Sequence, residues 1–206
     1  MSLGNPVPIS LTPDTMNVRL RETLDAWLKF GTAYLVYRLC MYYFVESDQD
    51  AVLFDSESLR IIFYILIGFT VYYMVVKPYI PVNLEHPILK NIGTDTLMFG
   101  TVLVSSHLLD VFMGGASLFN GEWLTSAGII LIAFGCYQVF IHPFIPTSNL
   151  NPTVKPIADD WLKFGVFLLA ARILQGRSVT DQTWILSVLF ILLGFTGYEL
   201  ITKKIL

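Results

Sequence analysis

The chain repeats one pattern of apolar segments three times. A Phe-Gly pair opens the first segment of each unit, at Phe30, Phe99 and Phe164, and an arginine or histidine follows seven residues after each glycine. The second segment of each unit carries a further phenylalanine, at Phe69, Phe134 and Phe195. Corresponding residues recur about every 65 positions, which is the signature of a repeat architecture. The pattern predicts three copies of one helical hairpin.

Composition indicates where these hairpins fold. The chain is 54% hydrophobic and 14% charged, whereas roughly a quarter of the residues in a soluble domain are charged. Six apolar stretches, near 26–45, 61–76, 96–113, 124–141, 161–175 and 184–201, approach the roughly 20 residues of a membrane-spanning helix. The predicted fold is therefore an all-α polytopic membrane protein with six transmembrane helices in three tandem hairpins, a pseudo-threefold repeat. The alternative, a soluble bundle, would leave little polar surface for so small a chain.

Prolines and polar linkers divide the chain. Pro78 and Pro143 follow the second and fourth apolar stretches, where proline ends a helix. The predicted segments are a polar, proline-bearing N-terminal segment (1–24), hairpin repeat 1 (25–81), linker and hairpin repeat 2 (82–146), and linker and hairpin repeat 3 (147–206), together one membrane domain. We expect Asp25, Asp95 and the pair Asp159-Asp160 to cap the first, third and fifth helices.

The distribution of basic residues predicts the orientation. One side of the membrane would carry Arg19, Arg21, Lys29, Lys77, Lys90, Lys155, Lys163, Lys203 and Lys204, and the loops on the other side only Arg60 and Arg177. The positive-inside rule therefore places both termini in the cytosol. Lys203 and Lys204 either anchor the last helix at the interface or form a dilysine signal for retrieval to the endoplasmic reticulum. Glu199 lies four residues before Lys203, a spacing that favours an ion pair.

Four polar residues within the spans form the candidate intramembrane site. Arg38, His107 and Arg172 occupy one position of the repeat, and Asp110 lies one helical turn after His107 and could pair with it. The simpler interpretation is that these long cations anchor helix ends at the interface. Around a pseudo-threefold axis they would instead form a cationic ring that selects anions or binds lipid phosphates.

Glycines recur at two positions of the repeat. Gly31, Gly100 and Gly165 follow the first phenylalanine of each unit, and Gly68 and Gly194 precede the second in two units. Small residues let membrane helices approach closely. We therefore expect these glycines to mark packing between the two helices of each hairpin.

Signals for enzyme chemistry are missing from the sequence. The three histidines, His86, His107 and His142, lack the spacing of a metal site, and no phosphate-binding loop or nucleophile elbow is found. Cys40 and Cys136 fall in predicted spans, where a pair of free thiols is the simplest expectation. We expect no enzyme activity, no cofactor, no metal and no nucleic-acid partner.

One string of the repeat carries a resemblance. Residues 155–165, KPIADDWLKFG, are echoed by residues 25–31, DAWLKFG. The string resembles segments of poorly characterised multi-span membrane proteins of nucleocytoplasmic large DNA viruses. The resemblance implies a structural protein of the internal virion membrane, and a dilysine retrieval tail would agree with the endoplasmic reticulum. The expected partners are membrane lipids, other membrane or capsid-layer proteins and further copies of the chain in a homo-oligomer. The alternative function is a small ion channel or transporter with a path along the pseudo-threefold axis.

Overall fold

The computed structural model describes residues 13–45, 52–80, 87–113, 117, 121–144 and 150–204, and every regular element in these ranges is helical. The predicted all-α class is confirmed. The α-helices are α1 (Pro13–Phe44), α2 (Ser56–Val71), α3 (Pro87–Phe112), α4 (Gly121–Cys136), α5 (Val154–Leu174) and α6 (Gln182–Leu200). Residues 1–12 of the predicted N-terminal segment, and residues 81–86 and 145–149 around the starts of the predicted linkers, lie outside the described residues.

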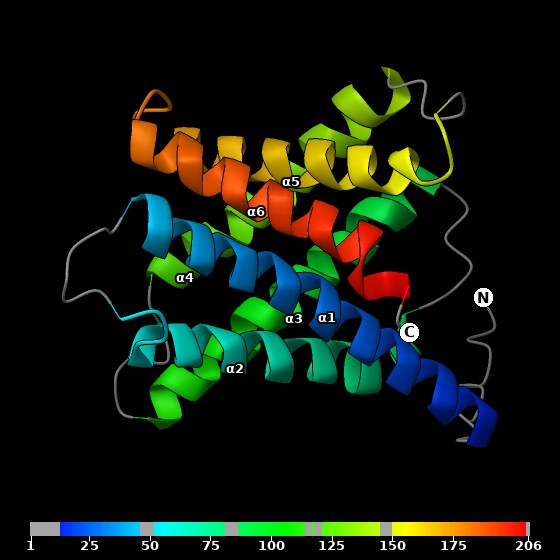
Figure 1. Ribbon diagram of the computed structural model, residues 1–206. Coiled ribbons are helices and arrows are strands. Elements are labelled where there is room, and N and C mark those ends of the chain that lie inside the picture. Colours follow the sequence, from blue (N-terminus) through cyan, green and yellow to red (C-terminus); the bar gives the residue numbers. More distant parts are fainter. Residues whose placement is uncertain are drawn as a thin grey trace.

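The six α-helices form a closed ring. Each packs against the helices before and after it in the chain, and α6 returns to pack against α1, which is the most extensive contact of all. The odd-numbered helices are not direct neighbours in this ring. Figure 1 shows α1 and α6 side by side, with α1 beginning at the end of the bundle where α6 finishes. Side chains of α1, α3 and α5 can therefore meet only across the centre.

The centre of the ring is filled by six phenylalanines, here called the phenylalanine cluster: Phe30, Phe69, Phe99, Phe134, Phe164 and Phe195. Within each hairpin two rings stack, with centroids 4.5, 5.0 and 4.4 Å apart. The three rings from the odd-numbered helices meet one another edge to face, at 5.5, 5.6 and 5.7 Å. Both arrangements are the preferred geometries of aromatic pairs. The repeated phenylalanines of the sequence thus form the core.

The odd-numbered helices begin earlier than the apolar stretches suggest. α1, α3 and α5 start at Pro13, Pro87 and Val154, about two to four turns before the stretches at 26, 96 and 161. Hydropathy detects only the apolar middle of a helix and misses polar turns that continue the same backbone. Asp95 and Asp160 consequently lie inside helices, as does Asp25, and the prediction that they cap helix starts is wrong.

Aspartates do cap two of the even-numbered helices. Asp55 precedes α2 and accepts a hydrogen bond from the Ser58 backbone N–H at 2.7 Å. Asp181 precedes α6 and accepts one from the Trp184 N–H at 3.2 Å. In each case the carboxylate satisfies an N–H that the first helical turn leaves without an intrahelical partner.

Two helices end in a widened turn followed by a tightened one. α2 continues into the π-helix η1 (Tyr72–Val76) and the 3₁₀ turn η2 (Lys77–Tyr79), and α4 into η3 (Tyr137–Ile141) and η4 (His142–Phe144). Pro78 and Pro143 explain this, because a proline has no N–H to donate and its ring would strike the carbonyl four residues back. The turn before it opens, and the Lys77 N–H reaches Tyr72 O, five residues back. Lys204 stands at the matching position after α6, and no π-turn forms there.

The outside of the ring is apolar. Leu131, Ile132 and Phe63 are about half exposed, and many other large apolar side chains are similarly open. Four helical segments, Ser56–Tyr79, Leu89–Phe112, Leu124–Phe144 and Gln182–Lys204, are long and apolar enough to cross a membrane. Such helices with such an outer surface indicate a membrane-embedded protein.

Candidate functional site

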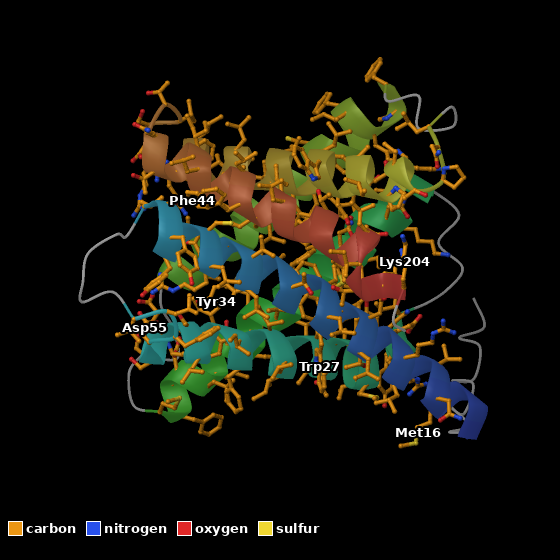
Figure 2. The ribbon with its side chains drawn as sticks, in the orientation of Figure 1. Met16, Trp27, Tyr34, Phe44, Asp55 and Lys204 are labelled. Carbon is orange, nitrogen blue, oxygen red and sulfur yellow. The ribbon has the colours of Figure 1, made fainter. Side chains whose placement is uncertain are left out.

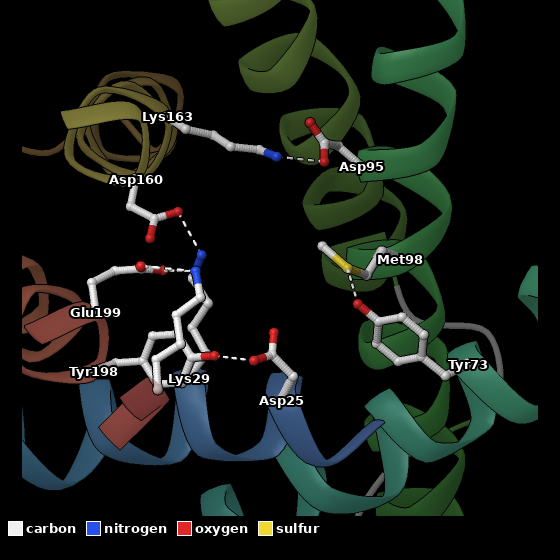
Figure 3. A network of polar contacts seen from close by, with 10 residues as sticks. Asp25, Lys29, Tyr73, Asp95, Met98, Asp160, Lys163, Tyr198 and Glu199 are labelled. Carbon is white, nitrogen blue, oxygen red and sulfur yellow. Dashed lines mark hydrogen bonds and ion pairs between the residues drawn. The ribbon is translucent and has the colours of Figure 1, made fainter. Parts of the chain in front are cut away.

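Charged residues gather at the end of the bundle where α1 begins. Figure 3 shows this group, here called the polar cluster: Asp25, Lys29, Tyr73, Asp95, Met98, Asp160, Lys163, Tyr198 and Glu199. The carboxyl-bearing residues Asp95, Asp160 and Glu199 are only 7–8% exposed. Ionisable groups buried within the helices of a membrane protein are costly and mark candidate functional sites. The polar cluster is therefore the candidate site of this chain.

Two ion pairs of the polar cluster cross the centre of the ring. Lys29 of α1 donates to Asp160 of α5 at 2.6 Å, and Lys163 of α5 donates to Asp95 of α3 at 2.5 Å. Each lysine directly precedes a phenylalanine of the phenylalanine cluster. Each aspartate lies four residues before a phenylalanine of the same cluster. The same sequence spacing thus produces the same pair twice, and each pair links two helices that are not neighbours in the ring.

The third pair of equivalent positions is uncharged. Met98 stands where Lys29 and Lys163 stand in the other units, and Ala26 stands where the aspartates stand. Both members of the pair are replaced together, so neither charge is left uncompensated. Met98 Sδ instead lies 3.9 Å from the Tyr73 hydroxyl, which donates to it.

The remaining contacts of the polar cluster join α6 to its surroundings. The Tyr198 hydroxyl donates to Asp25 of α1. Lys203 pairs with Glu199 at 2.9 Å, as their spacing in the sequence predicts. This pair places the Lys203 ammonium beside a carboxylate of its own helix, and anchoring or retrieval by Lys203 and Lys204 stays a prediction.

A polar cavity of about 280 Å³ opens beside the polar cluster, between the second and third hairpins. Its lining residues are Asn91, Thr94, Asp95, Tyr137, Gln138, His142, Asp159, Asp160 and Lys163. Two carboxylate oxygens here, Asp159 Oδ1 and Asp160 Oδ2, are buried with no hydrogen-bond partner in the described part of the chain. A second cavity, of about 470 Å³, is lined by Arg21, Glu22, Asp25, Tyr73, Lys77 and Lys203.

Arg38 holds the turn of the first hairpin. At the opposite end of the bundle, it donates to Ser58 Oγ at 3.1 Å and to Val52 O at 3.0 Å, and it lies 3.8 Å from Asp55. Figure 2 places Asp55 at the end opposite Lys204. Hydrogen bonds from Ser58 lower the pKa of the Asp55 carboxyl below its usual value, with a smaller contribution from the Arg38 guanidinium.

Arg172 makes the equivalent contacts in the third hairpin. It donates to Ser178 O at 2.9 Å and to Asp181 at 3.1 Å, and its guanidinium lies 5.6 Å from the centre of the Trp184 ring. Both arginines therefore contact the aspartate that caps the next helix. These contacts of Arg38 and Arg172 lie within separate hairpins and do not form one shared site.

The other two predicted site residues lie on α3. Asp110 accepts a hydrogen bond from the Tyr64 hydroxyl of α2. His107 is half-buried one turn earlier, and its pairing with Asp110 stays a prediction.

The glycines divide into two classes. A Cβ on Gly68 would lie 2.8 Å from Val102 Cα, and one on Gly194 would lie 2.4 Å from Ala33 Cα, so both positions require glycine. These partners belong to the next hairpin around the ring, and the prediction of close approach within a hairpin is wrong. A Cβ on Gly31, Gly100 or Gly165 would meet nothing within 4 Å, and the packing role predicted for these three is wrong as well.

Sequence reasoning missed Lys29, Lys163, Asp95 and Asp160 as site residues. The sequence does carry a signal for them. The third unit has both an aspartate four residues before its phenylalanine and a lysine one residue before it, whereas the first unit has only the lysine and the second only the aspartate. Which aspartate meets which lysine depends on ring closure, which spacing alone does not specify.

No metal-binding chemistry is evident in the polar cluster. In the described ranges, no three histidine, cysteine, aspartate or glutamate side chains converge in a way that could hold a metal ion. Cys40 and Cys136 are free thiols. Comparison of the chain with protein-family models, with curated proteins and with solved structures finds no match.

Proposed function

We propose that this chain is a structural integral membrane protein in which all six α-helices span the bilayer, as three tandem hairpins around a pseudo-threefold axis. In this proposal the bundle is a rigid, non-conducting element that holds a bilayer in register with an adjacent protein layer. The connecting segments on either side would supply the contacts to that layer.

Matching contacts in different hairpins support the tandem arrangement. Trp27 and Trp161 both lie three residues before a phenylalanine of the phenylalanine cluster. The Trp27 indole donates to Leu66 O and the Trp161 indole donates to Thr196 Oγ1, both at 2.9 Å. Each bond joins the first helix of a hairpin to its second helix. Two of the three hairpins thus share an indole contact from the first helix to the second, which supports the tandem arrangement.

The phenylalanine cluster is the observation that carries the structural function. The rings of Phe30, Phe99 and Phe164 meet at the centre of the ring, where a path along the axis would have to run. Each is backed by a stacked ring from the even-numbered helix of its hairpin. Close-packed interiors resist small displacements, so this centre favours a fixed bundle over a conduit.

Flux through liposomes tests this function. Purified protein is reconstituted in vesicles, and ion and solute leakage is compared with empty vesicles, with a pore-forming peptide as the positive control. We expect protein-bearing vesicles to be as tight as empty ones. Flux that appears with the native chain and falls when Arg38→Leu and Arg172→Leu are combined would refute a purely structural function.

A transporter is the second candidate, and the ion pairs favour it. The pairs Lys29–Asp160 and Lys163–Asp95 join helices that are not neighbours in the ring, and breaking and remaking these pairs at one end of the bundle could open and close a path. Ionisable residues inside membrane helices often serve transport. Substrate-dependent counterflow that Lys29→Met abolishes would favour this candidate over the structural one.

We also propose the cellular setting that the viral resemblance implies. The chain would reside in an internal virion membrane or in the endoplasmic reticulum, with both termini in the cytosol, bound to lipids and to membrane or capsid-layer proteins. Self-association is part of the same proposal. Protease protection of terminal tags in microsomes tests the orientation, because cytosolic tags are digested without detergent. Protection of either tag would contradict it.

A further inference from the structure

The polar cavity between the second and third hairpins contains more negative than positive charge. The carboxylates of Asp95, Asp159 and Asp160 line it, whereas Lys163 is the ammonium group in its lining and Lys29 reaches Asp160 from α1. His142 completes the titratable lining and packs its ring against Tyr137, with centroids 5.9 Å apart. With both lysines paired, one carboxylate remains in excess.

Two carboxylate oxygens of this cavity are buried, one on the buried residue Asp160 and one on the half-buried residue Asp159. Asp160 is 7% exposed, and its Oδ1 accepts from Lys29 while its Oδ2 has no partner in the described part of the chain. Figure 3 shows the second oxygen of Asp160 without a dashed line. Asp159 Oδ1 is likewise buried without a partner. Leaving such a group unpaired destabilises the fold, and more so when the group is charged.

The carboxylate at the matching position of the first hairpin does have a hydrogen-bond partner. Asp25 lies five residues before Phe30, as Asp159 lies five before Phe164, and Asp25 accepts a hydrogen bond from Tyr198. The cavity beside Asp25 is lined by three basic residues, Arg21, Lys77 and Lys203, against two acidic ones, Glu22 and Asp25. The excess of unpaired acceptors is therefore a property of the cavity at Asp159.

We propose that the cavity at Asp159 and Asp160 binds a primary ammonium group, carried by a small amine or by a lipid headgroup. An ammonium has three donors and no acceptor, which matches free carboxylate oxygens beside the tyrosine hydroxyl of Tyr137. The polar cluster already binds ammonium groups, since Asp160 holds that of Lys29 and Asp95 holds that of Lys163. Both also lie near aromatic faces, at 5.8 Å from the Phe195 centroid and 5.5 Å from that of Phe134.

Size and ligand geometry favour an organic cation over a metal ion. The volume of 280 Å³ corresponds to about nine water molecules, which is ample for a two-carbon amine with bridging water. Among the described residues, no group of side chains is placed to hold a metal ion.

Titration with ethylammonium chloride tests the proposal. Calorimetry on the purified full chain in detergent should show saturable binding that weakens at least tenfold in Asp159→Asn. The matched control is Asp25→Asn, at the same repeat position, whose amide oxygen still accepts from Tyr198 and which should bind like the native chain. Circular dichroism and gel filtration establish that each variant is folded, and Tyr137→Phe provides a second variant with weakened binding.

Further arms identify the source of the ammonium. Thermal stabilisation by phosphatidylethanolamine over phosphatidylcholine in nanodiscs, lost in Asp159→Asn, would identify a headgroup, whereas stabilisation by ethylammonium alone would identify a free amine. The proposal is overturned if neither probe binds, if Mg²⁺ or Na⁺ binds in their place, or if Asp159→Asn binds as well as the native chain. None of these results depends on whether the protein conducts.

Discussion

Replacing Gly194 by alanine should destabilise the bundle, whereas replacing Gly31 by alanine should not. The new Cβ at position 194 would lie 2.4 Å from Ala33 Cα and 2.7 Å from Ala33 O, against 3.4–4 Å for ordinary contact. α6 and α1 must therefore separate by about 1 Å along their most extensive contact. Overpacking of this kind costs about 1–3 kcal/mol.

The helix propensity of alanine acts in the opposite direction. A helical glycine replaced by alanine gains up to about 1 kcal/mol. Since a backbone clash lies at the upper end of the overpacking range, Gly194→Ala should lose about 2 kcal/mol net, or roughly 4–8 °C in the unfolding midpoint for a chain of this size. Gly31→Ala meets nothing within 4 Å and should gain up to about 1 kcal/mol. Gly68→Ala should fall between them, because Val102 Cγ1 can move but Val102 Cα cannot.

Thermal and SDS-induced unfolding in detergent, followed by circular dichroism, measures these differences. Adding Ala33→Gly to Gly194→Ala should not restore stability, because the closest atoms are the backbone of Ala33 and not its side chain. The reasoning fails if Gly194→Ala unfolds with the native chain, if Gly31→Ala loses as much stability, or if Ala33→Gly restores it.

Three further results are expected. Lys29→Met should lower the free energy of SDS unfolding by about 3 kcal/mol, because it leaves a buried carboxylate unpaired. Adding Asp160→Ala should recover most of that loss, since the corresponding pair of positions already holds Met98 and Ala26, and a double variant no more stable than the single one contradicts this. The pKa of Asp55 is lowered by folding, so its stabilisation is present above its usual value of 3.8 and disappears as the pH falls below it; thermal unfolding from pH 6 to pH 3 should show a drop that Asp55→Asn lacks. Arg172→Leu should speed tryptic cleavage after Arg177 without loss of helicity, because the turn loses its contacts; an unchanged cleavage rate would show that the turn does not need them.

The sequence repeat predicted the helices better than it predicted their neighbours. The spacing marked the six phenylalanines as repeat positions, but that they meet at the centre is seen only in the structure, because it depends on how the ring closes. Gly68 and Gly194 were recognised as small residues, but a repeat does not state whether a helix packs more closely on its own hairpin or on the next. That choice is made when the ring closes.

The candidate site was predicted less well for a related physical reason. Arg38 and Arg172 stood out because apolar residues surround them in the sequence, yet their charges are satisfied locally by carbonyls and capping aspartates. Asp160 was interpreted as a cap because it precedes an apolar stretch, and only the earlier start of α5 makes it an interior residue. Hydropathy shows where lipid begins and not where a helix begins.

The π-turns rotate the side chains that follow them. Lys77 and Lys203 both lie eight residues after a phenylalanine of the phenylalanine cluster, yet Lys77 pairs with Glu22 on another helix and Lys203 with Glu199 on its own. One extra residue in the turn shifts the helical phase by about 100°, so equal spacing in sequence becomes a different direction in space. A single proline therefore determines which helix the preceding lysine contacts. Lys204→Pro is expected to turn the Lys203 side chain away from Glu199 and toward a neighbouring helix.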